Sequence, residues 1–84
     1  MYYTYVLCSK KDGKFYTGFT ENLKLRFDQH NKGQVESTKN RRPFELIYYE
    51  ACLNRHDATY REKYLKTYNG KAYINKRLKS YLTG

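Results

Sequence analysis

Among the residues of this sequence that could do chemistry, Glu62 has the most unusual surroundings. From Ala58 to the end of the chain it is the only acidic residue, among seven Lys or Arg residues. On a helical wheel it falls between Ala58 and Leu65, on the apolar stripe expected to face the rest of the protein. An unpaired charge there is costly. The functional interpretation is a ligand for Mg²⁺ or Mn²⁺, because such ions often take only one or two protein carboxylates and keep their waters.

Two structural explanations for Glu62 compete with a metal site. The carboxylate could form an ion pair with Lys66, four residues further along the helix, or with Arg26 from another part of the chain. A different helical wheel, with the tyrosines at positions 60, 64 and 68 facing inward, would instead place the carboxylate in the solvent. The sequence leaves these alternatives open.

Arg26 and His30 form a second candidate pair. They lie four residues apart on a helix that begins after Thr20 or Asn22, so both side chains lie along one edge of that helix. A guanidinium can bind a phosphate through two hydrogen bonds, and an imidazole can exchange a proton near neutral pH. A solvated helix face with an incidental histidine would give the same spacing. His56 is assigned to that plain interpretation.

Tyr5 and Tyr16 lie on two predicted strands, residues 2–8 and 15–19, which an Asp-Gly pair joins as a hairpin. A two-residue loop would pair Leu7 with Gly18, whereas a four-residue loop would pair Tyr5 with Gly18. Both registers put the two tyrosines on one face of the sheet. We favour the longer loop, which sets Tyr16 diagonally beside Tyr5. Cross-strand packing would explain the tyrosines, but a glycine opposite them is typical of places where a ligand backbone approaches closely.

These residues are positioned by a simple succession of elements. Residues 44–52 are predicted to form a third, largely buried strand. Asn54 caps a helix that is expected to run to about Tyr68, where Asn69-Gly70 ends it, and a last helix runs from about Lys71 to Leu82. The order β-β-α-β-α-α predicts one α+β domain over residues 1–84, with a small three-stranded antiparallel sheet flanked by helices.

The charge balance indicates a polyanionic partner, nucleic acid before any other. Lys and Arg number 17 against 8 Asp and Glu, which gives a net charge of +9. The basic residues Lys39, Arg41 and Arg42 of one predicted loop, together with Lys66, are the candidate contacts to the phosphate backbone.

The two cysteines and the hydropathy of the chain exclude several classes of protein. Cys8 and Cys52 lie in predicted strands, without the spacing of a zinc site and too few for a disulfide framework. No apolar run approaches the length of a membrane span, and no signal peptide precedes the first strand. The sequence therefore predicts a cytoplasmic protein without a membrane partner.

Taken together, the candidate residues resemble the motifs of the GIY-YIG endonuclease superfamily. The matching segments are Tyr3-Thr4-Tyr5-Val6-Leu7, Tyr16-Thr17-Gly18, Arg26, His30 and Glu62. More narrowly, the chain looks like the small stand-alone proteins similar to the N-terminal nuclease domain of excinuclease C. The resemblance covers essentially the whole chain, and the set of spacings is fairly specific.

This resemblance implies a fold with a three-stranded sheet flanked by helices. It also implies an enzyme that hydrolyses DNA with one divalent metal, Mg²⁺ or Mn²⁺. Tyr5 and Tyr16 would activate or position water, and Arg26 would stabilise charge on the scissile phosphate. His30 would serve as general base, and Glu62 would be the metal ligand.

Three positions depart from the family pattern. Tyr3 and Thr4 stand where the name of the first motif has glycine and isoleucine. Phe19 occupies a place that often holds a lysine in the excision-repair branch, which implies weaker support for metal and phosphate. Asn75, which is not one of these departures, is a candidate match for an asparagine that many members have on a helix after the glutamate.

Three functions remain open at this point. The first is a structure-directed DNA endonuclease of repair or recombination, with a protein partner as a further source of specificity. The second is a nucleic-acid-binding module that keeps the fold but does not cut, and the third is an enzyme that acts on RNA. The complete set of five candidate side chains favours the first, because a binding module has no need for a lone carboxylate that repels phosphate.

Overall fold

Three antiparallel strands form the centre of the protein. The computed structural model describes residues 1–84, and its sheet has the strand order β2-β1-β3, with β1 at Tyr2–Ser9, β2 at Phe15–Thr20 and β3 at Phe44–Cys52. Aromatic and β-branched residues fill these segments, as a pleated, half-buried surface favours. The order of elements confirms the predicted α+β fold of a three-stranded sheet flanked by helices.

The hairpin has the register that the longer loop predicts. Tyr5 pairs with Gly18 and Leu7 with Tyr16. A Cβ added to Gly18 would lie 2.6 Å from the hydroxyl oxygen of Tyr5. The phenol ring of Tyr5 itself therefore requires a glycine at position 18.

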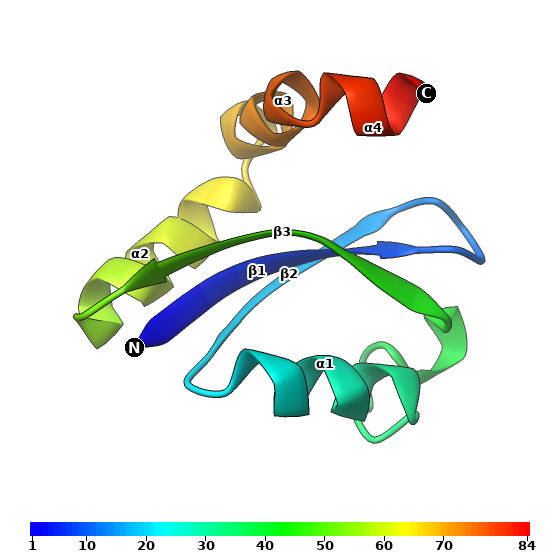
Figure 1. Cartoon of the computed structure of the whole chain (residues 1–84), viewed down its shortest axis with the longest axis horizontal. Coiled ribbons are helices and arrows are strands. Elements are labelled where there is room, and N and C mark those ends of the chain that lie inside the picture. Colours follow the sequence, from blue (N-terminus) through cyan, green and yellow to red (C-terminus); the bar gives the residue numbers. More distant parts are fainter.

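Helices cover both faces of the sheet (Figure 1). α1, Leu23–Asn31, packs against one face and begins after Asn22, whose side chain accepts a hydrogen bond from the backbone N–H of Leu25. The other face is covered by α2, Arg55–Leu65, and α3, Tyr68–Arg77. None of the helices has the length and apolar character that crossing a membrane requires.

The helix boundaries after β3 differ from the prediction. α2 ends at Leu65 rather than Tyr68, and Thr67 then caps α3 by accepting the backbone N–H of Gly70. The predicted break at Asn69-Gly70 is thus the first turn of the next helix. A Cβ on Gly70 would lie 2.1 Å from the carbonyl oxygen of Tyr64. The glycine is there because the two helices approach closely, not because it ends a helix.

Two further expectations need correction. The last helix is not continuous, since α3 is followed by the short helix α4, Lys79–Thr83, and the two meet at Leu78. β3 is an edge strand, and of its residues only Phe44 is fully buried. A largely apolar run therefore forms a half-buried strand here, because one long edge and part of one face lack a covering element.

The two faces of the sheet contain separate apolar clusters. Between the sheet and α1 lie Tyr5, Leu7 and Phe44, with Leu23 and Phe27 against them. On the opposite face the buried residues are Val6, Leu65 and Ile74. Because neighbouring strand residues point to opposite faces, Tyr5 belongs to the α1 side and Val6 to the α2 and α3 side.

Candidate active site

Tyr5 and His30 are joined by a hydrogen bond in the interior, between β1 and α1. The hydroxyl of Tyr5 lies 2.9 Å from Nε2 of His30, and Nδ1 of His30 lies 2.8 Å from Oγ1 of Thr38. All three residues are almost completely buried. His30 is therefore not an incidental histidine on a solvated helix face.

Tyr16 and Arg26 flank this buried pair and are both half-buried. The ring of Tyr16 lies 5.0 Å from that of His30, measured between centroids. Nη1 of Arg26 donates a hydrogen bond of 3.2 Å to Oε1 of Gln29 on the same helix. The hairpin and α1 thus bring together four of the five candidate side chains.

Burial changes the proton affinity of both groups in the pair. The pKa of Tyr5 rises to about 12, chiefly because burial penalises the phenolate; a hydrogen bond from Arg26 opposes this, and the charges of Tyr16 and Glu62 add to it. The pKa of His30 falls to about 4, again mainly through burial, with a contribution from the positive charge of Arg26. At neutral pH Tyr5 keeps its proton and His30 is uncharged.

Glu62 lies on the predicted face of α2, between the buried residues Ala58 and Leu65. Its side chain is only 17% exposed, and its Oε2 forms an ion pair of 3.0 Å with Nζ of Lys66. The structural explanation by an ion pair four residues along the helix is therefore confirmed. Lys66 is the only ion-pair partner of Glu62.

An ion pair of Glu62 with Arg26 and the alternative helical wheel are both wrong. Arg26 forms no ion pair with Glu62, and Tyr60 and Tyr68 are exposed rather than turned toward the core. The alternative helical wheel would have buried three tyrosines at the expense of Ala58 and Leu65, which fill the contact with the sheet.

The carboxylate lies on the side of α2 near the hairpin tyrosines. The negative charge of Glu62 is among the causes that raise the pKa of Tyr5. Its partner Lys66 lines a cavity of about 200 Å³ together with Tyr16, Thr17 and Lys71. The side chain of Glu62 is mostly buried, so the acid does not point into bulk solvent.

The donor set suits a lightly held hard cation. No group of three or more His, Cys, Asp or Glu side chains could hold a metal ion in this chain. Glu62 offers one shielded carboxylate, which fits the way Mg²⁺ uses one or two carboxylates, waters and substrate phosphates. It does not fit a metal that needs a full set of protein ligands.

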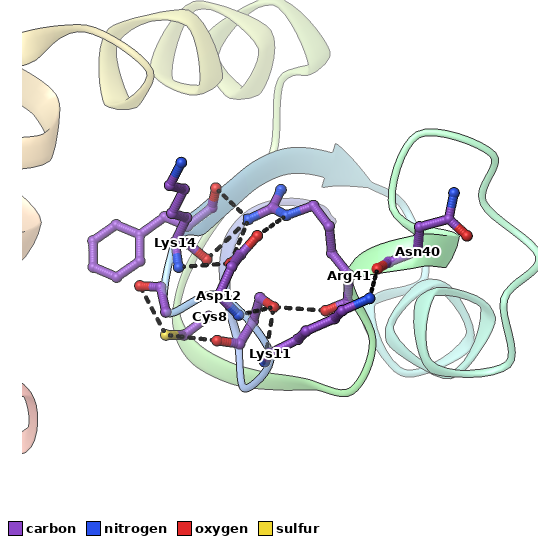
Figure 2. A network of polar contacts seen from close by, with 9 residues as sticks. Cys8, Lys11, Asp12, Lys14, Asn40 and Arg41 are labelled. Atoms are coloured by element: carbon purple, nitrogen blue, oxygen red, sulfur yellow. Dashed lines mark hydrogen bonds and ion pairs between the residues drawn. The ribbon is translucent and has the colours of Figure 1, made fainter.

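Arg41, a candidate phosphate contact, is used within the fold. Its guanidinium forms an ion pair of 2.9 Å with Asp12 and donates hydrogen bonds to the carbonyl oxygen of Lys14. Figure 2 shows Arg41 pointing into the hairpin loop that Asp12 and Lys14 belong to. The hydrogen bond from Arg41 is the main cause that lowers the pKa of Asp12 to about 2.

The other nucleic-acid candidates are more accessible. Arg42 is exposed, and its side chain donates only to the carbonyl oxygen of Lys39. The side chain of Lys39 forms an ion pair of 3.1 Å with the exposed Glu36. Lys66 is 54% exposed beside Glu62.

Phe19 occupies the position where the excision-repair branch often has a lysine, but another residue places a cation beside it. The guanidinium of Arg55 lies over the ring of Phe19, 5.4 Å from its centroid. Asn75 is exposed on α3 and donates to the carbonyl oxygen of Lys71, without a hydrogen bond to any candidate residue.

Sequence reasoning missed Thr38, the buried partner of His30. It lies eight residues after the histidine, just before the 3-10 turn Lys39–Arg41, and nothing in its sequence context shows that this segment folds back onto α1. The largest cavity, about 490 Å³ between α1 and β3, contains none of the candidate residues and is lined by Phe27, Leu46 and Tyr49 among others.

Comparison with known proteins decides the family. The model of the GIY-YIG catalytic domain matches residues 1–77. This chain belongs to the GIY-YIG family. Membership gives it a nuclease-family fold and indicates nucleic acid as the class of substrate.

Relatives of this GIY-YIG chain include several UPF0213 proteins. That of Pediococcus pentosaceus is 51% identical over 59 residues, which cover 68% of this chain and 60% of that protein. That of Staphylococcus aureus is 42% identical over 64 residues, covering 75% of this chain and 76% of the relative. The solution NMR structure of the UPF0213 protein from Bacillus halodurans matches with a TM-score of 0.53 and 31% identity, over 88% of this chain and 82% of the other. The GIY-YIG fold thus agrees with that of an experimentally solved relative.

Proposed function

We propose that this GIY-YIG protein is a divalent-metal-dependent endonuclease that hydrolyses phosphodiester bonds in DNA, directed by DNA structure in repair or recombination. The observation that supports it most is the cluster of Tyr5, Tyr16, Arg26 and His30 around one buried hydrogen bond. The carboxylate of Glu62 is close enough to this cluster to affect the pKa of Tyr5.

In this proposal Tyr16 positions the attacking water, and Tyr5 supports the site from the interior. Tyr16 is half-buried and reaches the solvent, so its hydroxyl is the one that water meets first. Tyr5 keeps its proton at neutral pH and directs it to His30. Both ring nitrogens of His30 are engaged, so any proton-accepting role of the imidazole is exercised through Tyr5.

Arg26 and Glu62 act on the phosphate. The guanidinium of Arg26 is half-buried at the mouth of the cluster and would pair with the non-bridging oxygens as negative charge builds on them. Glu62 would hold Mg²⁺ or Mn²⁺ through its carboxylate. The bound ion supplies a Lewis acid at the phosphate.

The test is cleavage of intact, nicked, branched and single-stranded DNA, with RNA in parallel, in Mg²⁺, Mn²⁺ or EDTA. We expect cutting of DNA that EDTA abolishes and that Glu62→Gln lowers by about a hundredfold or more, with DNA binding retained. Glu36→Gln is the matched control for cutting, because it removes an exposed carboxylate that pairs with Lys39 and with none of the candidate catalytic residues. Equal cutting by wild type and Glu62→Gln would contradict the proposal.

A second candidate, a nucleic-acid-binding module without cleavage, is favoured by one observation. The ion pair with Lys66 already neutralises Glu62, which is what a binding surface for phosphate requires. Tight, salt-sensitive DNA binding with no cutting in any metal would support it over the nuclease. Preferential cutting of RNA would show that the substrate is RNA and not DNA. Activity that appears only with an added protein would show that a partner supplies the specificity.

A further inference from the structure

Thr38, which is not among the candidate residues, extends the hydrogen-bonded pair of Tyr5 and His30 to a third buried side chain. Its hydroxyl lies 2.8 Å from Nδ1 of His30 and 3.5 Å from the carbonyl oxygen of Val35. Thr38 and His30 are both 0% exposed, and Tyr5 is 1% exposed. Water therefore does not reach these contacts, and every proton in the chain must be placed by the groups themselves.

The direction of the hydrogen bonds follows from Thr38. Its hydroxyl donates to the carbonyl oxygen of Val35, which can only accept. The oxygen of Thr38 is then left to accept a proton from Nδ1 of His30. An uncharged imidazole carries a single ring proton, so Nε2 is unprotonated and accepts the hydroxyl proton of Tyr5. Arg26, the other group near the Tyr5 oxygen, can only donate and therefore faces the lone pairs of that oxygen.

We propose that Thr38 is a positioning residue that sets the tautomer of His30 and thereby the orientation of the Tyr5 hydroxyl. With Nδ1–H held by Thr38, the Tyr5 proton points inward and the oxygen lone pairs point outward to Arg26 and the site. In the other tautomer Nε2–H would donate to Tyr5, and the tyrosine would turn its proton outward. Thr38 thus decides whether Tyr5 presents an acceptor or a donor to the site. The catalytic consequence rests on the proposed nuclease function, but the tautomer itself does not.

The matched variants are Thr38→Val, which keeps the shape and removes the acceptor, and Thr38→Ser, which keeps the hydroxyl. The primary readout is a two-bond ¹H–¹⁵N correlation spectrum of the histidine rings at pH 7, with His56→Gln used to assign the signals. We expect the Nδ1–H tautomer for His30 in wild type and Thr38→Ser. In Thr38→Val we expect the Nε2–H tautomer, because a lone pair facing a methyl group is less costly than an unpaired N–H.

DNA cleavage is the second readout. Thr38→Val should lower kcat about tenfold or more with little change in KM, and Thr38→Ser should restore it to within about threefold of wild type. An Nε2–H tautomer in the wild-type protein would overturn the inference, and so would a Thr38→Val variant with unchanged tautomer and unchanged cleavage. If Thr38→Val does not fold, the wild-type and Thr38→Ser spectra still decide. If no variant cuts DNA, the proposed function fails while the spectra test the tautomer independently.

Discussion

At the scale of single residues, the protein keeps an imidazole uncharged by surrounding it completely. His30 has no exposed surface, and both of its nitrogens have partners within 2.9 Å. Burial and the neighbouring Arg26 both disfavour the imidazolium. The free energy of unfolding should therefore depend on pH through the protonation of His30.

We predict that the folded state loses stability as the pH falls from about 6.5 to about 4. In that range the unfolded chain binds a proton at His30 that the folded chain, with its pKa of about 4, does not bind. The stabilising contribution of the uncharged His30 is fully present above the unfolded pKa of about 6.5. The free energy of unfolding falls by about 3 kcal/mol by pH 4, because each unit of pKa difference corresponds to about 1.36 kcal/mol. Urea unfolding across this range measures it.

The two histidines provide the control for this prediction. His56→Gln, at an exposed ring, should keep the pH dependence of the wild type, and His30→Gln should flatten it. An unchanged slope in His30→Gln would mean that another group is responsible.

The grouping of the candidate residues was predictable because their types and spacing match one set of motifs. The structure places Tyr5 and Tyr16 against His30. Arg26 and Glu62 lie near enough to affect the pKa of Tyr5. Thr38 was not predictable in the same way. A threonine in a polar loop is common, and its contact with His30 exists only because residues 32–38 fold back across α1.

At the scale of elements, Arg41 fastens the turn Lys39–Arg41 to the β1–β2 loop. Its side chain binds Asp12 and the carbonyl of Lys14, while its own carbonyl oxygen accepts a hydrogen bond of 2.6 Å from Ser9 (Figure 2). The segment that contains Thr38 is thereby held against the hairpin.

We predict that Arg41→Gln returns the carboxyl pKa of Asp12 from about 2 toward its usual 3.8, because the guanidinium is the main cause of the shift. Asp12 stabilises the fold above the unfolded pKa, and this contribution is lost as the pH falls through about 2. The pH titration of the carboxyl ¹³C signal measures the change. Arg42→Gln is the control and should leave Asp12 as in the wild type; an unshifted Asp12 in Arg41→Gln would contradict the assignment.

The sequence predicted which elements exist better than where they end. Asn-Gly is a strong local turn signal, yet Gly70 lies inside α3, because Thr67 caps that helix and the glycine lets it approach the end of α2. That close approach is a tertiary contact, and local pattern contains no information about it. The half-buried state of β3 has the same origin, since its exposure depends on its place at the edge of the sheet.

At the scale of the whole molecule, the net charge of +9 is spread over a small surface, and cations lie close to the candidate site. Lys66 and Lys71 line the cavity beside Tyr16, and Arg55 lies over Phe19. The α+β class and the strand order were accessible from pattern and family resemblance. Which cations remain free for phosphate was not, because Arg41 differs from Arg42 only in its folded contacts.

We predict that DNA affinity falls about ten- to a hundredfold between about 50 and 200 mM salt, as expected for about two to four phosphate contacts. Fluorescence anisotropy measures the slope of log affinity against log salt. Arg42→Gln should reduce that slope by about one, the amount expected for the loss of one phosphate contact. Arg41→Gln should leave the slope unchanged, because the guanidinium of Arg41 already pairs with Asp12. A slope near zero would exclude phosphate contacts as the main source of affinity.

We predict that the acid of α2 and the hydroxyls of the hairpin form one site for a divalent ion and a phosphate. A Mn²⁺ titration of ¹⁵N-labelled protein tests this most directly, because the ion broadens nearby amide signals. We expect broadening that begins at Glu62 and Tyr16, spares Glu36, and disappears in Glu62→Gln. Broadening that is centred elsewhere, or that persists unchanged in Glu62→Gln, would show that the two groups do not share a site.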